Sequence, residues 1–203
     1  MKLTWLGHSC FAVEQDGYQI ILDTYRDVAG HADIRAEAHA VLCSHGHFDH
    51  GAVEGVTILP EKENPFTVRT VATCHDEEGG ALRGPNTIHV LTAGGVTIAH
   101  LGDLGHQLTA EQLAALGKVD GILIPIGGTY TVTAEGAKQV CEAVQPKFVV
   151  PMHYRHGTYG FPVITTLEEF TKLWSADEVH VHPTAELEIT ADLTGVQVLT
   201  FGA

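Results

Sequence analysis

Four potential metal ligands lie within six residues of one another in the first third of the chain. They are His45, His47, Asp49 and His50, which supply three imidazoles and one carboxylate. Imidazole suits zinc and iron, while mixed histidine and aspartate shells also admit manganese. Because Asp49 and His50 are adjacent and point in different directions, one tetrahedral ion would not easily bind all four groups. Two ions explain the spacing better, one held by His45 and His47 and the other by Asp49 and His50.

Two ions held about 3.5–4 Å apart would support hydrolysis. The pair would hold a bridging hydroxide, formed near neutral pH, and would polarise the bond that this hydroxide attacks. The leaving group would take its proton from water or from an acid of the site, for which Asp49, His8 and His106 are the candidates. A solvated, metal-free turn is the alternative interpretation of the segment 45–50. A metal-free turn would be the ordinary interpretation of a segment with one or two histidines. It is not the ordinary interpretation of a segment with four potential ligands behind a buried strand.

Apolar segments elsewhere in the chain also end at side chains that bind metals. The segments at 40–44, 71–74, 98–102 and 149–152 lead directly to His45, His75, Asp103 and His153. If these segments are strands whose ends meet along one edge of a sheet, the four side chains share a single cleft. Rigid strands beneath loops are a common way to hold metal ligands in place.

Short strands and turns are predicted for the first half of the chain, from β-type alternation and short apolar runs. A hairpin turn at Gln15-Asp16-Gly17 joins the second of these strands to the third. The predicted strands are Lys2 to Leu6, Ser9 to Glu14, Tyr18 to Leu22, Ala40 to Cys43, Phe66 to Cys74, Thr87 to Leu91 and Val96 to Leu101.

Helices are predicted in the second half of the chain. Thr109 and Gln112 have the spacing of a capping box, and the helix that they begin ends near Gly117. Two further helices span Thr133 to Val144 and Thr166 to Trp174, two buried strands span Gly121 to Pro125 and Lys147 to Met152, and the tail from Val179 to Phe201 is β-like. Strands first, and then strands alternating with helices, indicate an α/β sandwich with helices outside the sheets.

The overall composition narrows the class of protein. With 203 residues, of which 44% are hydrophobic and 18% charged, the chain suits one globular domain over residues 1–203. Its net charge of -14, from 11 basic and 25 acidic residues, repels phosphate backbones, so we expect no nucleic-acid partner. The expected partner is a small-molecule substrate. The sequence leaves open whether the chain forms a homo-oligomer.

The cellular location is predicted from three features. The longest apolar runs fall short of the roughly 20 residues that cross a bilayer, so we expect no membrane partner. The N-terminus lacks the apolar stretch and cleavage site of a secretory signal. The four cysteines form no C-x-x-C pair, which is typical of buried free thiols in a reducing compartment. These features together predict a cytoplasmic protein.

The histidine and aspartate pattern at 45–50 is the signature of the metallo-β-lactamase superfamily, which this chain resembles. The later elements follow in the expected order, with His75 after a strand, Asp103 in a Gly-Asp turn and His153 after a buried strand. Within the superfamily, the chain looks like the branch of small metal-dependent hydrolases that contains L-ascorbate-6-phosphate lactonase. That closer resemblance is carried by the segments 5–9, 83–86, 100–106, 125–128 and 151–154. It implies a four-layer αββα sandwich, the metallo-β-lactamase fold.

The resemblance also implies which side chains bind metal. It implies a first site of His45, His47 and His75, a second site of Asp49, His50 and His153, and Asp103 as a bridge between them. Asp49 and Asp103 would be catalytic residues as well as ligands. His75 has rivals in His89 and His100, because the Gly-His-Thr-x-Gly segment of many superfamily members is replaced here by a different sequence at 74–79.

The activity that the resemblance implies is that of a metal-dependent hydrolase acting on a small ester, lactone or phosphoester. Asp103, in place of the cysteine that some true β-lactamases use nearby, favours these substrates over β-lactams. The cofactors would be two divalent metal ions, with zinc favoured and manganese or iron as alternatives. Two other functions stay open on the same fold, which hosts many chemistries: a non-catalytic metal-binding or sensor module, and an iron-dependent oxidoreductase.

Four further side chains each have two interpretations. His8, His100 and His106 lie in segments that resemble motifs, and they are either hydrogen-bond partners or proton shuttles of the site, or structural residues. Asp23 closes an apolar strand. It either hydrogen-bonds the free nitrogen of a ligand histidine or caps the turn.

Overall fold

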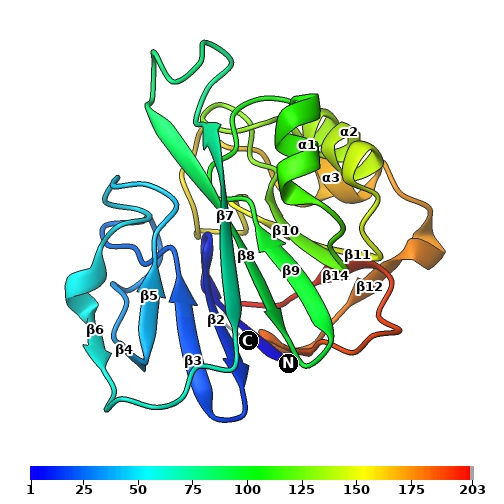
Figure 1. Cartoon of the computed structure of the whole chain (residues 1–203). Coiled ribbons are helices and arrows are strands. Elements are labelled where there is room, and N and C mark those ends of the chain that lie inside the picture. Colours follow the sequence, from blue (N-terminus) through cyan, green and yellow to red (C-terminus); the bar gives the residue numbers. More distant parts are fainter. Residues whose placement is uncertain (202–203) are drawn as a thin grey trace.

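Two β-sheets form the middle of the protein, as a computed structural model that describes residues 1–201 shows (Figure 1). The five-stranded sheet contains, in spatial order, β13 (Glu186–Glu188), β1 (Lys2–Gly7), β2 (Cys10–Gln15), β3 (Tyr18–Leu22) and β5 (Ala40–Leu42). The seven-stranded sheet contains β12 (Val179–Val181), β14 (Gly195–Val198), β11 (Phe148–Met152), β10 (Gly121–Pro125), β9 (Val96–His100), β8 (Pro85–Ala93) and β7 (Thr67–Cys74). The predicted strands are therefore confirmed, with ends shifted by one or two residues.

Both sheets contribute to one main hydrophobic core. In β1, Leu3 and Trp5 are buried and alternate with partly covered neighbours, as expected for a strand with one face inward. Ile88 and Val90 of β8 belong to the same core from the opposite sheet. The central strands β10 and β11 are parallel and buried along their whole length, because both of their faces are covered.

Three α-helices lie on the outer side of the seven-stranded sheet: α1 (Ala110–Leu116), α2 (Ala134–Val144) and α3 (Glu168–Thr171) (Figure 1). The capping box of α1 is confirmed, since the Thr109 hydroxyl accepts the Gln112 N–H and the Gln112 side chain accepts the Thr109 N–H. Thr133 is the N-cap of α2, because its hydroxyl accepts the N–H of Gly136. No helix within residues 1–201 has the length and apolar character needed to span a membrane.

The third helix is shorter than the predicted span from Thr166 to Trp174. It has no side-chain cap, and it is held instead by Phe170, which is fully buried and meets the Trp174 ring edge-on at 5.7 Å. A helix of one turn depends on tertiary packing rather than on its own propensity. The sequence pattern therefore predicted the presence of this helix correctly and its length wrongly.

The outer side of the five-stranded sheet is covered by a different kind of layer. It consists of the short parallel pair β4 (Ala36–Ala38) and β6 (Val56–Ile58), the 3-10 helix η1 (Val53–Gly55) and the loops around them. A second apolar cluster lies beneath this layer and includes Cys10, Ile21, Tyr25, Val28 and Ile34. The sequence did not predict β4 and β6, because each has three residues with a polar one in the middle, which is too short to show a period and, unlike β5, is not an apolar run.

The C-terminal tail takes part in both sheets. After the 3-10 helix η2 (Ala176–Glu178), β12 and β14 pair in parallel at one edge of the seven-stranded sheet. Between them, β13 crosses to the other sheet and pairs antiparallel with β1. The β-like character predicted for the tail is confirmed. Its strands close one side of the space between the sheets.

The strands that precede the predicted ligands all end at the same side of the molecule. β9, β10 and β11 are parallel, and β7 and β9 both run antiparallel to β8, so β7 shares their direction. In the other sheet, β3 and β5 are parallel. Ligands gather where the carboxyl ends of such strands meet.

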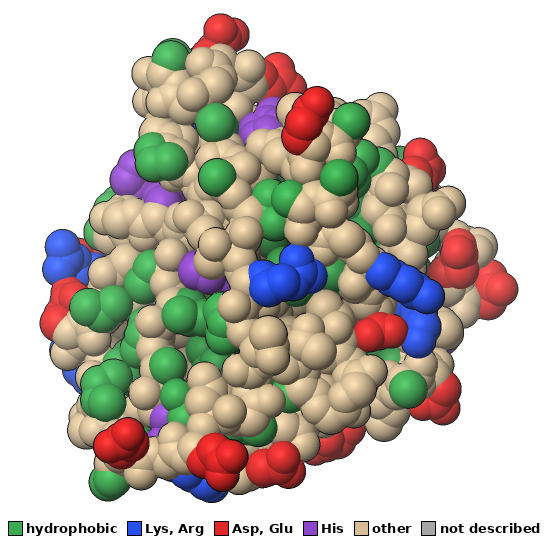
Figure 2. All heavy atoms as spheres, viewed as in Figure 1, with side chains coloured by type: hydrophobic (Ala, Val, Ile, Leu, Met, Phe, Trp, Pro, Cys, Tyr) green, Lys and Arg blue, Asp and Glu red, His purple; other side chains and the backbone are tan. Residues whose placement is uncertain are grey.

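On the face in Figure 2, acidic side chains are spread widely and basic ones form no continuous patch.

Candidate metal centre

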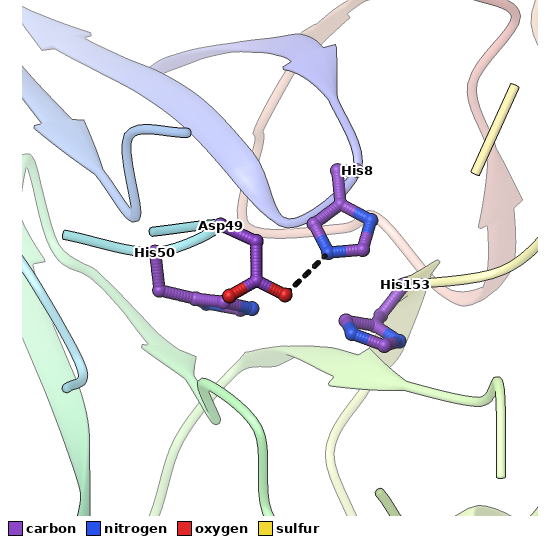
Figure 3. Close-up of side chains that lie close together, drawn as sticks. All are labelled: His8, Asp49, His50 and His153. Atoms are coloured by element: carbon purple, nitrogen blue, oxygen red, sulfur yellow. Dashed lines mark ion pairs between the residues drawn. The ribbon is translucent and has the colours of Figure 1, made fainter. Parts of the chain in front are cut away.

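Side chains that could hold metal ions gather where these strands end. They form three groups, and within each group the potential ligand atoms all lie within 4.8 Å of one another. The groups are His45, His47 and His75; His8, Asp49, His50 and His153; and His45, His50 and Asp103. The structure thus brings together all seven side chains that the sequence nominated, and it adds His8. Figure 3 shows the group that contains His8.

Asp103 lies between the group of His45, His47 and His75 and the group that contains His8. Its Oδ1 is 3.1 Å from His50 Nε2, while its Oδ2 is 3.1 Å from His75 Nε2 and 3.4 Å from His153 Nε2. The carboxylate is almost completely buried. It therefore contacts histidines of both of these groups, as a bridging ligand must.

The backbone of Asp103 is fixed by Asn86 and by the glycine before it. Asn86 Oδ1 accepts the Asp103 N–H at 2.9 Å, and the amide nitrogen of Asn86 donates to neighbouring oxygens. Gly102 has a φ of +56°, and a Cβ at this position would lie 2.3 Å from Asn86 Oδ1 and 2.4 Å from Ser44 Cβ. The turn thus needs glycine both for its backbone conformation and for the close approach of two neighbouring side chains.

Three of the ligand histidines are oriented by a hydrogen bond on the Nδ1 side of the ring. The contacts join His75 Nδ1 to Tyr130 O at 3.0 Å, His45 Nδ1 to Ser44 Oγ at 2.9 Å, and His50 Nδ1 to Asp23 Oδ2 at 2.7 Å. Such contacts fix which ring nitrogen faces a metal. In each of these residues, Nε2 is the nitrogen left for an ion.

Asp23 contacts both His50 and Ser44, the residue that orients His45. Its Oδ2 accepts hydrogen bonds from His50 and from the Ser44 hydroxyl, and its Oδ1 accepts the Ser44 N–H at 2.6 Å. Burial opposes ionisation, but the imidazoles of His50 and His100 and these hydrogen bonds hold the pKa of Asp23 at about 2. Of the two interpretations that the sequence left open, the structure supports the hydrogen bond to a ligand histidine.

Several buried atoms of the three groups have no hydrogen-bond partner within residues 1–201. They are His45 Nε2, His50 Nε2, Asp103 Oδ1 and both ring nitrogens of His8 and of His153. The 3.1 Å contact of His50 with Asp103 is close enough for a hydrogen bond but lacks its geometry. A buried polar group without a partner costs about 1–3 kcal/mol, and such groups are rare in native structures. Metal ions would satisfy these atoms, so the donor set fits a histidine and carboxylate metal centre.

The titration behaviour of His8, His45 and Asp103 agrees with this fit. Burial lowers the pKa of His8 to about 3 and that of His45 to about 4. A neutral imidazole is the form that binds a metal. Burial opposes the ionisation of Asp103 as well, but His153 and His50 hold the pKa of this carboxyl well below its usual range. His8 and His45 therefore offer neutral imidazoles beside an ionised carboxylate, whereas at His50 the charges of Asp103 and Asp23 outweigh burial and raise the pKa.

The two rivals of His75 lie outside all three groups. His89 donates from Nε2 to the carbonyl of Cys43 at 3.0 Å. His100 donates from Nε2 to the carbonyl of Ser9 at 2.8 Å. Both histidines therefore connect strands or turns through the backbone. His75 is the one that the structure places beside His45 and Asp103.

His106 is also committed to the backbone. Its Nε2 accepts the Cys74 N–H at 3.1 Å, and its Nδ1 donates to the carbonyl of Gln107 at 2.8 Å. It therefore holds the end of β7, directly before His75, and both of its nitrogens are used. This leaves Asp49 and His8 as the residues at the centre that could handle a proton.

A cleft of about 380 Å³ opens over the centre. Its lining combines ligands with an aromatic and cationic rim, and consists of His47, Phe48, Asp49, His75, Arg83, Asp103, Tyr130 and Phe161. The Phe161 ring lies 6.3 Å from the Phe48 ring and 6.2 Å from the Tyr130 ring. The Arg83 guanidinium lies 5.8 Å from the centre of the Tyr130 ring. The volume suits a small molecule.

The loop that carries Arg83 is organised around Asp76. One carboxylate oxygen of Asp76 accepts the N–H groups of Glu78 and Gly80, and the other accepts those of Leu82 and Arg83. Desolvation opposes ionisation, but these backbone hydrogen bonds lower the pKa of Asp76. An ionised Asp76 thus fixes the backbone of Arg83 at the rim of the cleft.

Some residues that support the centre were missed by the sequence analysis. Asn86 lay in a segment singled out for its resemblance, but nothing indicated that its amide would hold Asp103. Asp76 could have been noticed as an acidic residue before a glycine-rich loop, which is a common turn signal. The carbonyl of Tyr130 had no signal at all, since every residue has a carbonyl group.

Comparisons with known sequences agree on a family. The family model described as "Beta-lactamase superfamily domain" matches residues 2–153. A UPF0173 metal-dependent hydrolase of Carboxydothermus hydrogenoformans is 32% identical over 191 residues, covering 76% of this chain and 84% of that protein. A UPF0173 protein of Pyrococcus furiosus is 33% identical over 185 residues, covering 79% of this chain and 85% of that protein.

Solved structures show the same likeness. A protein from Thermotoga maritima, described as a candidate Zn-dependent hydrolase of the metallo-β-lactamase superfamily, matches with a TM-score of 0.77 and 30% identity. The match covers 98% of this chain and 97% of that one. A metallo hydrolase from Ignicoccus hospitalis matches with a TM-score of 0.64 at 23% identity, which is a likeness of fold alone. The predicted fold class, the metallo-β-lactamase sandwich, is confirmed.

Proposed function

The chain belongs to the metallo-β-lactamase superfamily and, within it, to the UPF0173 metal-dependent hydrolases, and from this premise we propose that it is a hydrolase that uses two divalent metal ions. The proposed substrate is a small ester, lactone or phosphoester. Zinc is the favoured ion, with manganese and iron as alternatives, because the grouped donors are imidazoles and carboxylates.

One observation carries this proposal. Two clusters of potential donors, one of three histidines and one that contains an aspartate, are linked by the single buried carboxylate of Asp103. Most of these donors lack partners among the described residues, and the cleft opens directly over them. A structural histidine cluster would be expected to satisfy its own hydrogen bonds and would not need to face a cleft.

The protein's part in the reaction would be to hold the two ions, to orient the side chains that bind them and to transfer a proton. His45, His47 and His75 would hold one ion, Asp49, His50 and His153 the other, and Asp103 both. When bound, the ions supply Lewis acidity and lower the pKa of a coordinated water towards neutrality. Asp49 is the carboxylate that belongs to the second group and also lines the cleft. We assign it the transfer of a proton to the leaving group.

The rim of the cleft supports a more specific substrate. Phe48, Tyr130 and Phe161 offer aromatic surface, and Arg83 is the one cationic side chain among the lining residues. Arginine binds carboxylate and phosphate groups through charge-assisted hydrogen bonds. We therefore favour a substrate with an apolar body and a negative group. A phosphorylated lactone, suggested by the resemblance to L-ascorbate-6-phosphate lactonase, is one such compound.

The experiment that tests the proposal measures metal content and activity together. Elemental analysis of the purified protein should find about two ions per chain. A screen of lactones, phosphodiesters, carboxylic esters and thioesters, with zinc and with manganese, should find turnover of one class that a chelator abolishes. No bound metal and no turnover after reconstitution would reject the hydrolase and favour a sensor module. Bound iron with redox activity would instead favour the oxidoreductase.

Replacing Arg83 by glutamine should raise KM for an anionic substrate about tenfold to a hundredfold, because a charged hydrogen bond is worth roughly 1.5–3 kcal/mol. We expect kcat to change little, since Arg83 lies at the rim and not among the ligand groups. Steady-state kinetics on the anionic substrate and on a neutral analogue of the same shape separate the contribution of charge to KM from the contribution of shape. Arg69→Gln, which removes an arginine bound to carbonyls of α1, is the matched control. An equal loss on both substrates would reject the role in charge recognition.

Replacing Asp23 by asparagine should weaken metal binding by about 10- to 100-fold, the usual effect of removing a partner of a ligand histidine. The carboxylate accepts from the Ser44 N–H, the Ser44 hydroxyl and His50 through its two oxygens. Asparagine replaces one of these oxygens by an NH2 donor, so it loses part of this set of hydrogen bonds. Titration of the metal-free protein with Zn²⁺ against a competing chelator measures the loss. Asp120→Asn is the matched control, because Asp120 also accepts a backbone N–H but lies outside the three groups. Unchanged affinity in Asp23→Asn would show that His50 does not need this partner.

A further inference from the structure

His8 is a buried histidine that the seven-ligand assignment does not use. Only 1% of the residue is exposed, and neither ring nitrogen has a hydrogen-bond partner within residues 1–201. Buried side-chain nitrogens nearly always have a partner, so an imidazole with two unsatisfied nitrogens requires an explanation. His153, which faces His8 with ring centroids 4.2 Å apart, has the same property.

The backbone at His8 is held in an unfavourable conformation. His8 has a φ of +51°, in the left-handed region that residues with a side chain rarely adopt. The conformation is fixed because the His8 carbonyl accepts hydrogen bonds from Trp5 Nε1 at 3.0 Å and from the His153 N–H at 3.3 Å. His153 has a φ of +54°. Strain of this kind is concentrated at ligand-binding and active sites.

The turn before His8 is equally constrained. Gly7 has a φ of +106°, and a Cβ there would lie 2.6 Å from His31 Nδ1 and 2.8 Å from the Tyr25 hydroxyl. That hydroxyl donates to the Leu6 carbonyl at 2.8 Å. The packing therefore leaves the turn little freedom and directs the His8 ring inward, towards Asp49 and His153.

The distances around His8 suit a shared ion better than a hydrogen bond. His8 Nε2 lies 3.7 Å from Asp49 Oδ2, which is too long for a hydrogen bond (Figure 3). Two ligands of one tetrahedral zinc ion, each bound at its usual distance, are about 3.4 Å apart. The ligand atoms of His8, Asp49, His50 and His153 all lie within 4.8 Å of one another. The four side chains thus surround one point from three separate parts of the chain.

We propose that His8 is a ligand of the second metal ion, together with Asp49, His50 and His153. The inference rests on the proposed two-metal function and adds a ligand that the superfamily resemblance did not supply. It also makes the two ions unequal. Whether Asp103 is counted at both ions or at neither, the second ion has one more protein ligand than the first. A fuller protein shell holds an ion more tightly, whereas a catalytic ion keeps an open position. The ion at His8 should therefore bind first and leave last.

Titration of the metal-free protein with Co²⁺ tests this assignment through the visible absorption of the bound ion. The wild-type protein should take up two ions in two steps. His8→Ala should weaken the tighter step at least about a hundredfold, more than the loss of a supporting residue does, and should change its spectrum. His47→Ala, which removes a ligand of the first group, should weaken the other step instead.

Two further variants distinguish the loss of a metal ligand from a disturbance of folding. His8→Asn should behave like His8→Ala, because asparagine tolerates the left-handed backbone but is too short to replace the imidazole. His31→Ala disturbs the packing against Gly7 without removing a grouped side chain, and it should keep both steps.

Two results would overturn the assignment, and they can be told apart. If both His8 variants bind two ions with wild-type affinity and spectrum, His8 is not a ligand and the two-metal hydrolase stands without it. If the wild-type protein itself binds fewer than two ions, the proposed function fails and the assignment fails with it.

Discussion

Replacing Asp103 by alanine is expected to lower kcat/KM by at least about a thousandfold, because the metal ions are worth several kcal/mol of transition-state stabilisation and roughly 4 kcal/mol is a thousandfold in rate. Asp103 contacts His75 of the first group and His50 and His153 of the second, so its loss should affect both ions at once. Kinetic assays and elemental analysis of the same preparation measure the two effects. The metal content should fall together with the activity.

Two comparison variants make this result specific. His50→Ala should also lose most of the activity, but it should remove metal mainly from the second group, since His47 and His75 do not depend on it. Asp177→Ala removes an exposed carboxylate outside every ligand group and should change neither activity nor metal content. Full activity of Asp103→Ala or His50→Ala with a full metal complement would show that the two-metal scheme is wrong.

Replacing Gly102 by alanine is expected to lower the free energy of unfolding by about 2–5 kcal/mol. The left-handed backbone should cost roughly 1–2 kcal/mol with a side chain present, and the added methyl should cost about 1–3 kcal/mol more by overpacking. The second contribution arises because the new Cβ would lie 2.3 Å from Asn86 Oδ1 and 2.4 Å from Ser44 Cβ. Urea unfolding measures the change, through the midpoint at constant slope. Metal affinity should fall too, since Asn86 holds Asp103 and Ser44 holds Asp23.

Gly157→Ala separates the two contributions to the loss of stability. Gly157 has a φ of +57°, close to that of Gly102, but a Cβ there would meet no atom within 4 Å. It should therefore lose only the roughly 1–2 kcal/mol of the backbone conformation and keep its metal affinity. If Gly102→Ala were no less stable than Gly157→Ala, the turn before Asp103 would be loose, and the packing argument for the position of Asp103 would be wrong.

The predicted ligands lie close together because of a rule of sheet geometry that can be applied to the sequence before the fold is known. Each of His75, Asp103 and His153 follows an apolar strand, and strands that run in one direction end at one edge. The predictions of local structure were accurate for the same reason. The capping box at Thr109 and the hairpin turn at 15–17 depend on residues next to one another in the chain, so their chemistry is readable without the fold.

The sequence by itself determined the fold class, the strands that lead to the ligands and the seven nominated side chains, because alternation, caps and close ligand spacing are local properties. Only the tertiary structure decided what surrounds them. His8 and His153 are 145 positions apart, yet their rings face each other, and no local pattern predicts such a contact. The choice of His75 over His89 and His100 also depended on partners distant in the chain. Contacts of this kind arise from the packing of the two sheets, which the sequence encodes only as a whole.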